Sequence, residues 1–160
     1  MGIRFLDTPI FIKWMAAKKK KLSLEAAISG YILAKIMKGE KAVTTTLVKD
    51  EVTIWLSRYK ASALPKFINS LRALVYLEIL SPTLGDQEEA CRNFGKYPLG
   101  ISDLINLAVM RRKNINEIYT TDTGYSSAGI KIIFHELSKD PDFKAFIKNL
   151  ENKGFKPSFH

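Results

Sequence analysis

The chain has 160 residues, with 25 Lys and Arg against 16 Asp and Glu, a formal net charge of +9 and 46% hydrophobic residues. This length fits one compact domain, and the apolar fraction excludes a disordered or fibrous chain. The single cysteine, Cys91, excludes an intrachain disulfide and leaves no Cys and His set for zinc, so a cytoplasmic protein is expected. No apolar run approaches the roughly 20 residues of a membrane helix, and no targeting segment is predicted.

The positive charge is concentrated in the first half of the chain. Residues 1–80 hold 14 basic and 6 acidic side chains, whereas residues 81–160 hold 11 and 10. Such a surplus attracts polyanions, of which nucleic acid is the commonest in a cytoplasm. Composition alone is not specific, because many basic proteins never contact nucleic acid.

Strands and helices are predicted to alternate in the first half. An apolar run at 3–6 indicates a strand that ends at Asp7, after which Thr8 and Pro9 begin a helix. A second helix is expected from Ser23 to Met37, then a strand at 42–46 and a helix to Tyr59. The apolar spacing over 64–75 predicts an amphipathic helix, and a strand follows at 75–80.

The same alternation continues in the second half. A helix is predicted over 84–95, and the next one has Ser102 as its N-cap candidate and ends at the basic residues 111–113. Strands are expected at 117–121 and 130–134, and a closing helix around 143–150. The chain therefore reads as one domain over residues 1–153, with a flexible tail at 154–160.

This order predicts an α/β fold, in which a mostly parallel central sheet is flanked by helices on both faces. Ligands of such sheets bind outside the carboxyl ends of the strands. Asp7 and Asp122 each close a predicted strand, Glu51 lies in the helix after the second strand, and Asp103 begins a helix. These four acids can therefore converge, although they are far apart in the sequence.

Four neighbouring carboxylates would repel one another, and a divalent cation is the usual resolution. Oxygen ligands without His or Cys favour Mg²⁺ or Mn²⁺. Each acid also has an ordinary structural interpretation. Asp7 and Asp122 suit turns at strand ends, Asp103 suits the start of a helix, and Glu51 suits a solvated helix face.

Four segments resemble the motifs of the PIN-domain ribonuclease family, most closely its single-domain VapC-like toxins. They are residues 3–12 (IRFLDTPIFI), 43–52 (VTTTLVKDEV), 99–108 (LGISDLINLA) and 118–125 (IYTTDTGY). The resemblance spans roughly residues 3–135 and implies a PIN-like three-layer sandwich. It also implies a metal-dependent endoribonuclease with one or two Mg²⁺ or Mn²⁺ ions held by Asp7, Glu51, Asp103 and Asp122.

The resemblance assigns roles to these residues. Asp7 and Asp103 are expected as direct metal ligands, Glu51 as the group that positions or deprotonates water, and Asp122 as the residue that completes the metal shell. Thr120 matches a position where the family often has a hydroxyl, although a threonine is also ordinary in a strand.

The sequence departs from the family at three positions near the predicted site. Pro9 replaces a residue that is commonly polar, Gly124 replaces an acid, and Tyr125 replaces the usual Phe. These departures motivate an alternative, a catalytically weak or inactive PIN-like subunit that binds RNA or serves in assembly. A phospho-acceptor signalling domain of similar topology is less compatible, because Asp7 has no adjacent acid and Glu51 lies on a helix.

Several basic residues are candidate contacts for an RNA backbone. They are Lys18, Lys19, Lys20, Lys21, Arg58, Lys60, Arg111, Arg112 and Lys113. A run of charges is more often a solvated face. Trp14 and Trp55 could stack on bases, but their apolar neighbours favour packing. The resemblance further implies a homodimer and an antitoxin partner, bound across the helices at 10–37 and 64–75.

Overall fold

The computed structural model describes residues 2–159, in which five strands form one parallel sheet of order β3-β2-β1-β4-β5. The strands are β1 (Arg4–Leu6), β2 (Ala42–Thr45), β3 (Leu77–Leu80), β4 (Glu117–Tyr119) and β5 (Lys131–Ile133). Parallel strands need crossover connections, and helices supply them here. The predicted α/β class with a parallel central sheet flanked by helices is confirmed.

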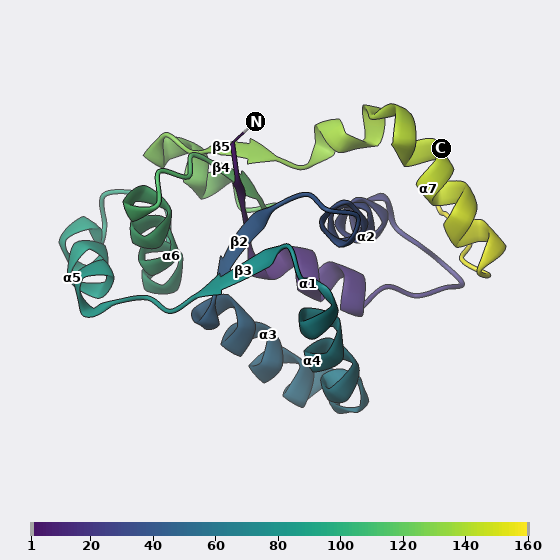
Figure 1. Cartoon of the computed structure of the whole chain (residues 1–160), viewed down its shortest axis with the longest axis horizontal. Coiled ribbons are helices and arrows are strands. Elements are labelled where there is room, and N and C mark those ends of the chain that lie inside the picture. The colour runs from purple at the N-terminus through teal and green to yellow at the C-terminus, as the bar shows by residue number, and fades with distance from the viewer. Residues whose placement is uncertain (1, 160) are drawn as a thin grey trace.

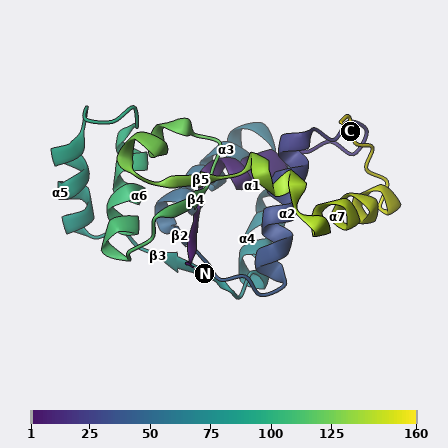
Figure 2. The ribbon, with the colours of Figure 1, turned by 90° about the horizontal axis from the view of Figure 1, so that it is seen from above.

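The helices follow the predicted order, with boundaries that differ by a few residues. They are α1 (Thr8–Met15), α2 (Leu24–Met37), α3 (Thr46–Tyr59), α4 (Leu64–Ala73), α5 (Leu84–Asn93), α6 (Ile101–Arg112) and α7 (Pro141–Asn152). Helices α5 and α6 lie at one end of the molecule and α7 lies at the other (Figures 1 and 2). Within residues 2–159, no helix is long and apolar enough to cross a membrane.

Three short 3₁₀ helices lie outside the elements predicted from periodicity. They are η1 (Ala61–Ala63), η2 (Thr123–Ala128) and η3 (His135–Lys139). Helix η2 occupies the segment expected as a loop between the last two strands. It begins directly after Asp122, whose side chain accepts a hydrogen bond from Gly124 N at 2.9 Å.

Polar side chains at the ends of strands begin the helices that follow. The Asp7 carboxylate accepts from Thr8 N at the start of α1, and the Thr45 hydroxyl accepts from Val48 N at the start of α3. Such caps satisfy backbone N–H groups that a helix start leaves unpaired. Each cap therefore fixes where the chain turns from the sheet into a helix.

The core combines the sheet with α2, which is buried on most of its surface. Side chains of β1, β2 and β4 that are almost inaccessible include Phe5, Leu6, Val43, Ile118 and Tyr119. Trp14 packs against Gly30 of α2, where an added Cβ would lie 2.5 Å from the indole ring. The indole also stacks on Phe155 with a centroid distance of 5.7 Å, so packing accounts for Trp14.

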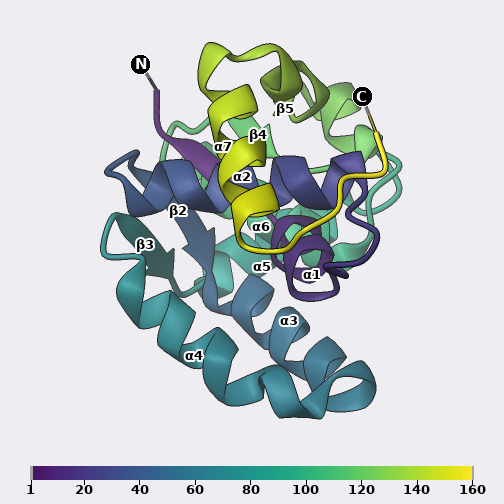
Figure 3. The same ribbon diagram turned by 90° about the vertical axis from the view of Figure 1, so that its right-hand side faces the viewer.

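Residues after α7 contact the domain along the segment predicted to be a tail. Leu22 N donates to Lys156 O and Ser158 N donates to Leu22 O, both at 2.9 Å. This segment runs from the end of α7 past α1 (Figure 3). In the same segment, Phe155 stacks on Trp14 of α1.

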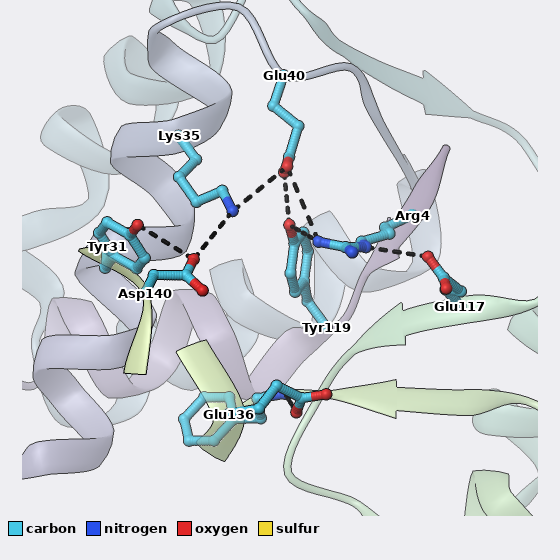
Figure 4. Close-up of polar contacts among 9 residues, drawn as sticks. Arg4, Tyr31, Lys35, Glu40, Glu117, Tyr119, Glu136 and Asp140 are labelled. Atoms are coloured by element: carbon cyan, nitrogen blue, oxygen red, sulfur yellow. Dashed lines mark hydrogen bonds and ion pairs between the residues drawn. The ribbon is translucent and has the colours of Figure 1, made fainter. Parts of the chain in front are cut away.

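A polar network ties α7 to the sheet (Figure 4). Arg4 of β1 donates to Glu117 at 3.0 Å and to the Tyr119 hydroxyl at 2.8 Å, and this hydroxyl donates to Glu40 at 2.5 Å. Lys35 of α2 lies 3.7 Å from Glu40 and 3.6 Å from Asp140, the residue before α7. Ion pairs and hydrogen bonds therefore link β1, β4, α2 and the start of α7.

The strand order creates a crevice beside β1. Strand β1 lies between β2 and β4, so the chain leaves β1 toward one side of the sheet and returns on the other. Ligand sites of open α/β sheets lie at such a switch point, outside the carboxyl ends of the strands. Asp7 follows β1 and Asp122 follows β4, which places both at this edge.

Candidate active site

The four acids expected at the site line one cavity of about 310 Å³. Asp7 follows β1, Glu51 lies in α3, Asp103 lies in the first turn of α6, and Asp122 follows β4. Helix α6 precedes β4 and returns antiparallel to it, so its first turn reaches the carboxyl edge of the sheet. Four separate segments of the chain thus bring a carboxylate to the same cavity.

Asp7 is the most deeply buried of the four, with 2% of its surface exposed. Oδ1 accepts from Thr8 N at 2.9 Å and Oδ2 accepts from the Thr120 hydroxyl at 2.7 Å. Burial raises the pKa of Asp7 to about 7, because the hydrogen bonds only partly offset the loss of water and the charges of Asp103 and Glu51 add to it. The surroundings of Asp7 therefore do not fully compensate a negative charge on its carboxylate.

Asp103 and Asp122 form the second part of the site. Burial and the nearby Asp122 carboxylate raise the pKa of Asp103 to about 6. The Tyr125 hydroxyl donates to Oδ1 of Asp103 at 3.2 Å, which opposes this rise. Asp122 N in turn donates to the Thr120 hydroxyl at 3.1 Å, so Thr120 joins the turn after β4 to Asp7.

Glu51 is held by two hydroxyl groups from other elements. Thr8 donates to Oε1 and Ser102 donates to Oε2, both at 3.4 Å. Burial raises the pKa of Glu51 above its ordinary value. The expectation that Ser102 caps α6 is wrong, because α6 begins at Ile101 with Gly100 as its N-cap, and the Ser102 hydroxyl points to Glu51 instead.

The donor set fits a hard divalent cation. Carboxylate oxygens of this kind are ligands of Mg²⁺ and Mn²⁺, and the raised pKa values of Asp7 and Asp103 reflect desolvation and repulsion that a cation relieves. Among the residues that the structure describes, however, no three His, Cys, Asp or Glu side chains converge tightly enough to hold an ion as they stand. Asp7, Glu51, Asp103 and Asp122 are the residues that would hold such an ion.

The predicted basic residues lie away from this cavity or are already bonded. Lys18–Lys21 form an exposed turn beyond the far end of α1, about 12 Å of helix from Asp7. Arg111, Arg112 and Lys113 lie at the opposite end of α6 from Asp103. The Arg112 guanidinium donates twice to Asp86, at 3.0 and 2.9 Å. Arg58 ends α3, and Lys60 donates to Met15 O.

Sequence reasoning missed three residues at the site. Lys13 lines the cavity with the acids, Ser102 holds Glu51, and Tyr125 holds Asp103. Lys13 of α1 lies six residues after Asp7, a spacing that does not align two side chains on one helix face, so no local pattern marked it as a neighbour of the site. The bonds of Ser102 and Tyr125 depend on how α6 and η2 pack, which no local pattern reports.

Comparison with known families identifies the fold. The family model described as the PIN domain matches residues 4–131. No curated protein sequence matches this chain. Residues after 131, which include α7 and the segment against Leu22, lie outside the matched domain.

Solved structures share the fold at low sequence identity. VapC20 of Mycobacterium tuberculosis, described as a sarcin-ricin loop cleaving toxin, superposes with a TM-score of 0.65 and 22% identity over 79% of this chain and 95% of that chain. VapBC2 of Rickettsia felis bound to promoter DNA superposes with a TM-score of 0.58 and 16% identity, over 82% of this chain and 97% of that chain. FitAcB of Neisseria gonorrhoeae superposes with a TM-score of 0.60 and 13% identity, over 82% of this chain and 96% of that chain.

Proposed function

The chain belongs to the PIN domain family, and from this premise we propose that it is a metal-dependent endoribonuclease that hydrolyses phosphodiester bonds of RNA. The observation that carries the proposal is the convergence of Asp7, Glu51, Asp103 and Asp122 on one cavity. The raised pKa values of Asp7 and Asp103 support a site that is built for a cation.

Asp7 and Asp103 are the proposed direct ligands of Mg²⁺ or Mn²⁺, and Asp122 completes the set. A divalent cation at such a site lowers the pKa of a bound water and offsets charge on the phosphate. Glu51, held by Thr8 and Ser102, is placed to orient a water or accept its proton. Thr120 fixes the Asp7 carboxylate by donating to Oδ2.

Lys13 gives the cavity a positive group among the acids. Its ammonium lies 3.1 Å from Glu25 at the surface, and its side chain is 31% exposed. From this position Lys13 can bind a phosphate of the RNA backbone beside the scissile bond. The net charge of +9 adds long-range attraction, which grows toward +13 if two divalent cations neutralise the four acids.

We further propose that the protein is the toxin of a toxin-antitoxin pair. Similar structures include a toxin-antitoxin complex from Klebsiella pneumoniae, with a TM-score of 0.58 and 16% identity over 81% of this chain and 95% of that chain. A groove of about 680 Å³ runs between α1, α2, α4 and α7 and offers a surface for an antitoxin segment. Lys19, Lys60, Lys66 and Lys153 border it, and no acid is among its described lining residues, which favours an acidic, amphipathic segment. A homodimer stays a prediction.

The alternative function is a weak or inactive subunit that binds RNA or serves in assembly. Gly124 favours it, since an added Cβ there would lie 2.5 Å from Pro98 O and 2.9 Å from Leu99. The packing therefore has no space for the acid that the family often carries at this position. An ion would be held with one carboxylate fewer.

Cleavage of labelled single-stranded RNA separates the two functions. The purified protein is incubated with Mn²⁺ or Mg²⁺, with EDTA, and as the variant Asp7→Asn. We expect cutting that requires the metal and falls at least about 100-fold in the variant, since Asp7 is a proposed ligand. RNA that is bound and not cut under all conditions would support the alternative.

A further inference from the structure

Tyr125 is a buried phenol at the edge of the acidic cavity. Its side chain is fully buried in η2, and its hydroxyl donates to Oδ1 of Asp103 at 3.2 Å. Burial and the acids around it raise the pKa of Tyr125 well above its ordinary value. The hydroxyl is a hydrogen-bond donor to the Asp103 carboxylate.

The backbone around Tyr125 is held on both sides. Gly124 packs so closely on Pro98 O that a Cβ has no space, and Gly124 N donates to Asp122 Oδ1 at 2.9 Å. Ile130 N donates to Tyr125 O at 3.2 Å and leads the chain into β5. The ring is thus carried on a fixed turn, and its hydroxyl can hold the carboxylate in one orientation.

The carboxylates of buried Asp7 and half-buried Asp103 are held differently. Both oxygens of Asp7 accept hydrogen bonds, from Thr8 N and from Thr120. Asp103 is held through Oδ1 by a side chain from another element, 22 residues away in the sequence. The bond from Tyr125 restricts rotation of the Asp103 carboxylate and engages one of its two oxygens.

We propose that Tyr125 is a positioning residue that orients Asp103 for a divalent cation. The inference rests on the proposed metal site, and it assigns to Tyr125 a bond that a phenylalanine at this position could not make. Hydrogen-bond partners that orient metal ligands commonly contribute 10–100-fold to metal affinity or activity. The phenol strengthens a site that Gly124 leaves short of a carboxylate.

Calorimetric titration of Mn²⁺ into the metal-free protein tests the proposal. The variant is Tyr125→Phe, which removes one oxygen and keeps the ring. The matched control is Tyr31→Phe, because Tyr31 is also buried and donates to a carboxylate, Asp140, at the same 3.2 Å but away from the cavity. We expect about a 10-fold loss of Mn²⁺ affinity in Tyr125→Phe and wild-type affinity in Tyr31→Phe.

The outcomes separate this proposal from the proposed function. Equal Mn²⁺ affinities in wild type and Tyr125→Phe would overturn the role of Tyr125 and leave the metal site standing. No Mn²⁺ binding to the wild type would overturn both. Thermal unfolding in EDTA checks that both variants are folded.

Discussion

The Thr120 hydroxyl donates to Oδ2 of Asp7 at 2.7 Å, across 113 residues of sequence. It joins the ends of β1 and β4, the two strands that border the crevice. The Thr120 hydroxyl oxygen also accepts a hydrogen bond from Asp122 N, so one hydroxyl connects two acids of the site. A residue predicted as a supporting hydroxyl thus lies where it can set the geometry of the carboxylate cluster.

The stability of the metal-free protein should depend on pH through Asp7. Its pKa is raised from 3.8 to about 7 in the folded state. The folded protein therefore binds this proton more tightly than the unfolded chain does. The stabilisation of the folded state by protonated Asp7 is complete below pH 4 and is lost as pH rises through 7. We expect Tm in EDTA to fall between pH 5 and pH 8.

The variant Asp7→Asn should weaken this dependence, because it has no charge to desolvate. At pH 8 in EDTA its Tm should exceed that of the wild type by at least about 2–4 °C, the shift that ~1 kcal/mol causes in a chain of this size. Asp50→Asn, at an exposed acid beside Glu51, serves as the control. A wild-type Tm that is flat or rises over this range would contradict the assignment.

Most of the fold could be predicted from the sequence. The apolar run of β1, the start of a helix near Ser23 and the apolar spacing of α4 are local signals, and a strand or helix forms at each of these places. Helix η2 was missed because its short 3₁₀ turns have no apolar period. Its position instead depends on the contact of Gly124 with Pro98.

The site could be predicted only in part. Acids at the carboxyl ends of strands follow from the topology of a parallel sheet. The hydroxyls of Ser102 and Tyr125 could not be assigned, because their partners lie 51 and 22 residues away and the contacts depend on tertiary packing. The basic residues were chosen by composition, which does not report that Arg112 is bonded to Asp86.

Asp86 should stabilise the contact between α5 and α6. Its carboxylate accepts from Arg112 and from Thr83 N, and the bonds to Arg112 hold its pKa below the ordinary value. This contribution is present above pH 4 and is lost as pH falls below it. Asp86→Asn should lower Tm at pH 7, and the difference from wild type should shrink toward pH 3. Glu88→Gln, an exposed change on the same helix, should have little effect.

Lys13 should contribute to RNA affinity through a phosphate. RNA binding is measured by fluorescence anisotropy at several salt concentrations, in the Asp7→Asn background to prevent cutting. Lys13→Ala should weaken binding and reduce the slope of log K against log salt by about 0.7, the value for one contact to a single strand. Arg112→Ala should change the slope less, since Arg112 lies at the end of α6 opposite Asp103 and the acidic cavity. Equal slopes in Lys13→Ala and the parent would exclude the contact.

Gly124 should tolerate no side chain. A methyl group there would lie 2.5 Å from Pro98 O, so Gly124→Ala should destabilise the protein by about 1–3 kcal/mol. Gly85→Ala is the control, because its nearest contact would be an ordinary 3.6 Å. Chemical unfolding compares the two, and similar stabilities would show that η2 can move away from Pro98. Gly124→Asp should likewise fail to raise Mn²⁺ affinity.

The shift of Tm on addition of Mn²⁺ at pH 7.5 tests most directly whether the four carboxylates form one metal site. An ion that binds only the folded state stabilises it by about 2.7 kcal/mol at 100 times its Kd. We expect Mn²⁺ to raise the Tm of wild type and of Asp50→Asn, and to leave Asp7→Asn and Asp103→Asn nearly unchanged. Equal shifts in all four proteins, or no shift in the wild type, would contradict a shared metal site.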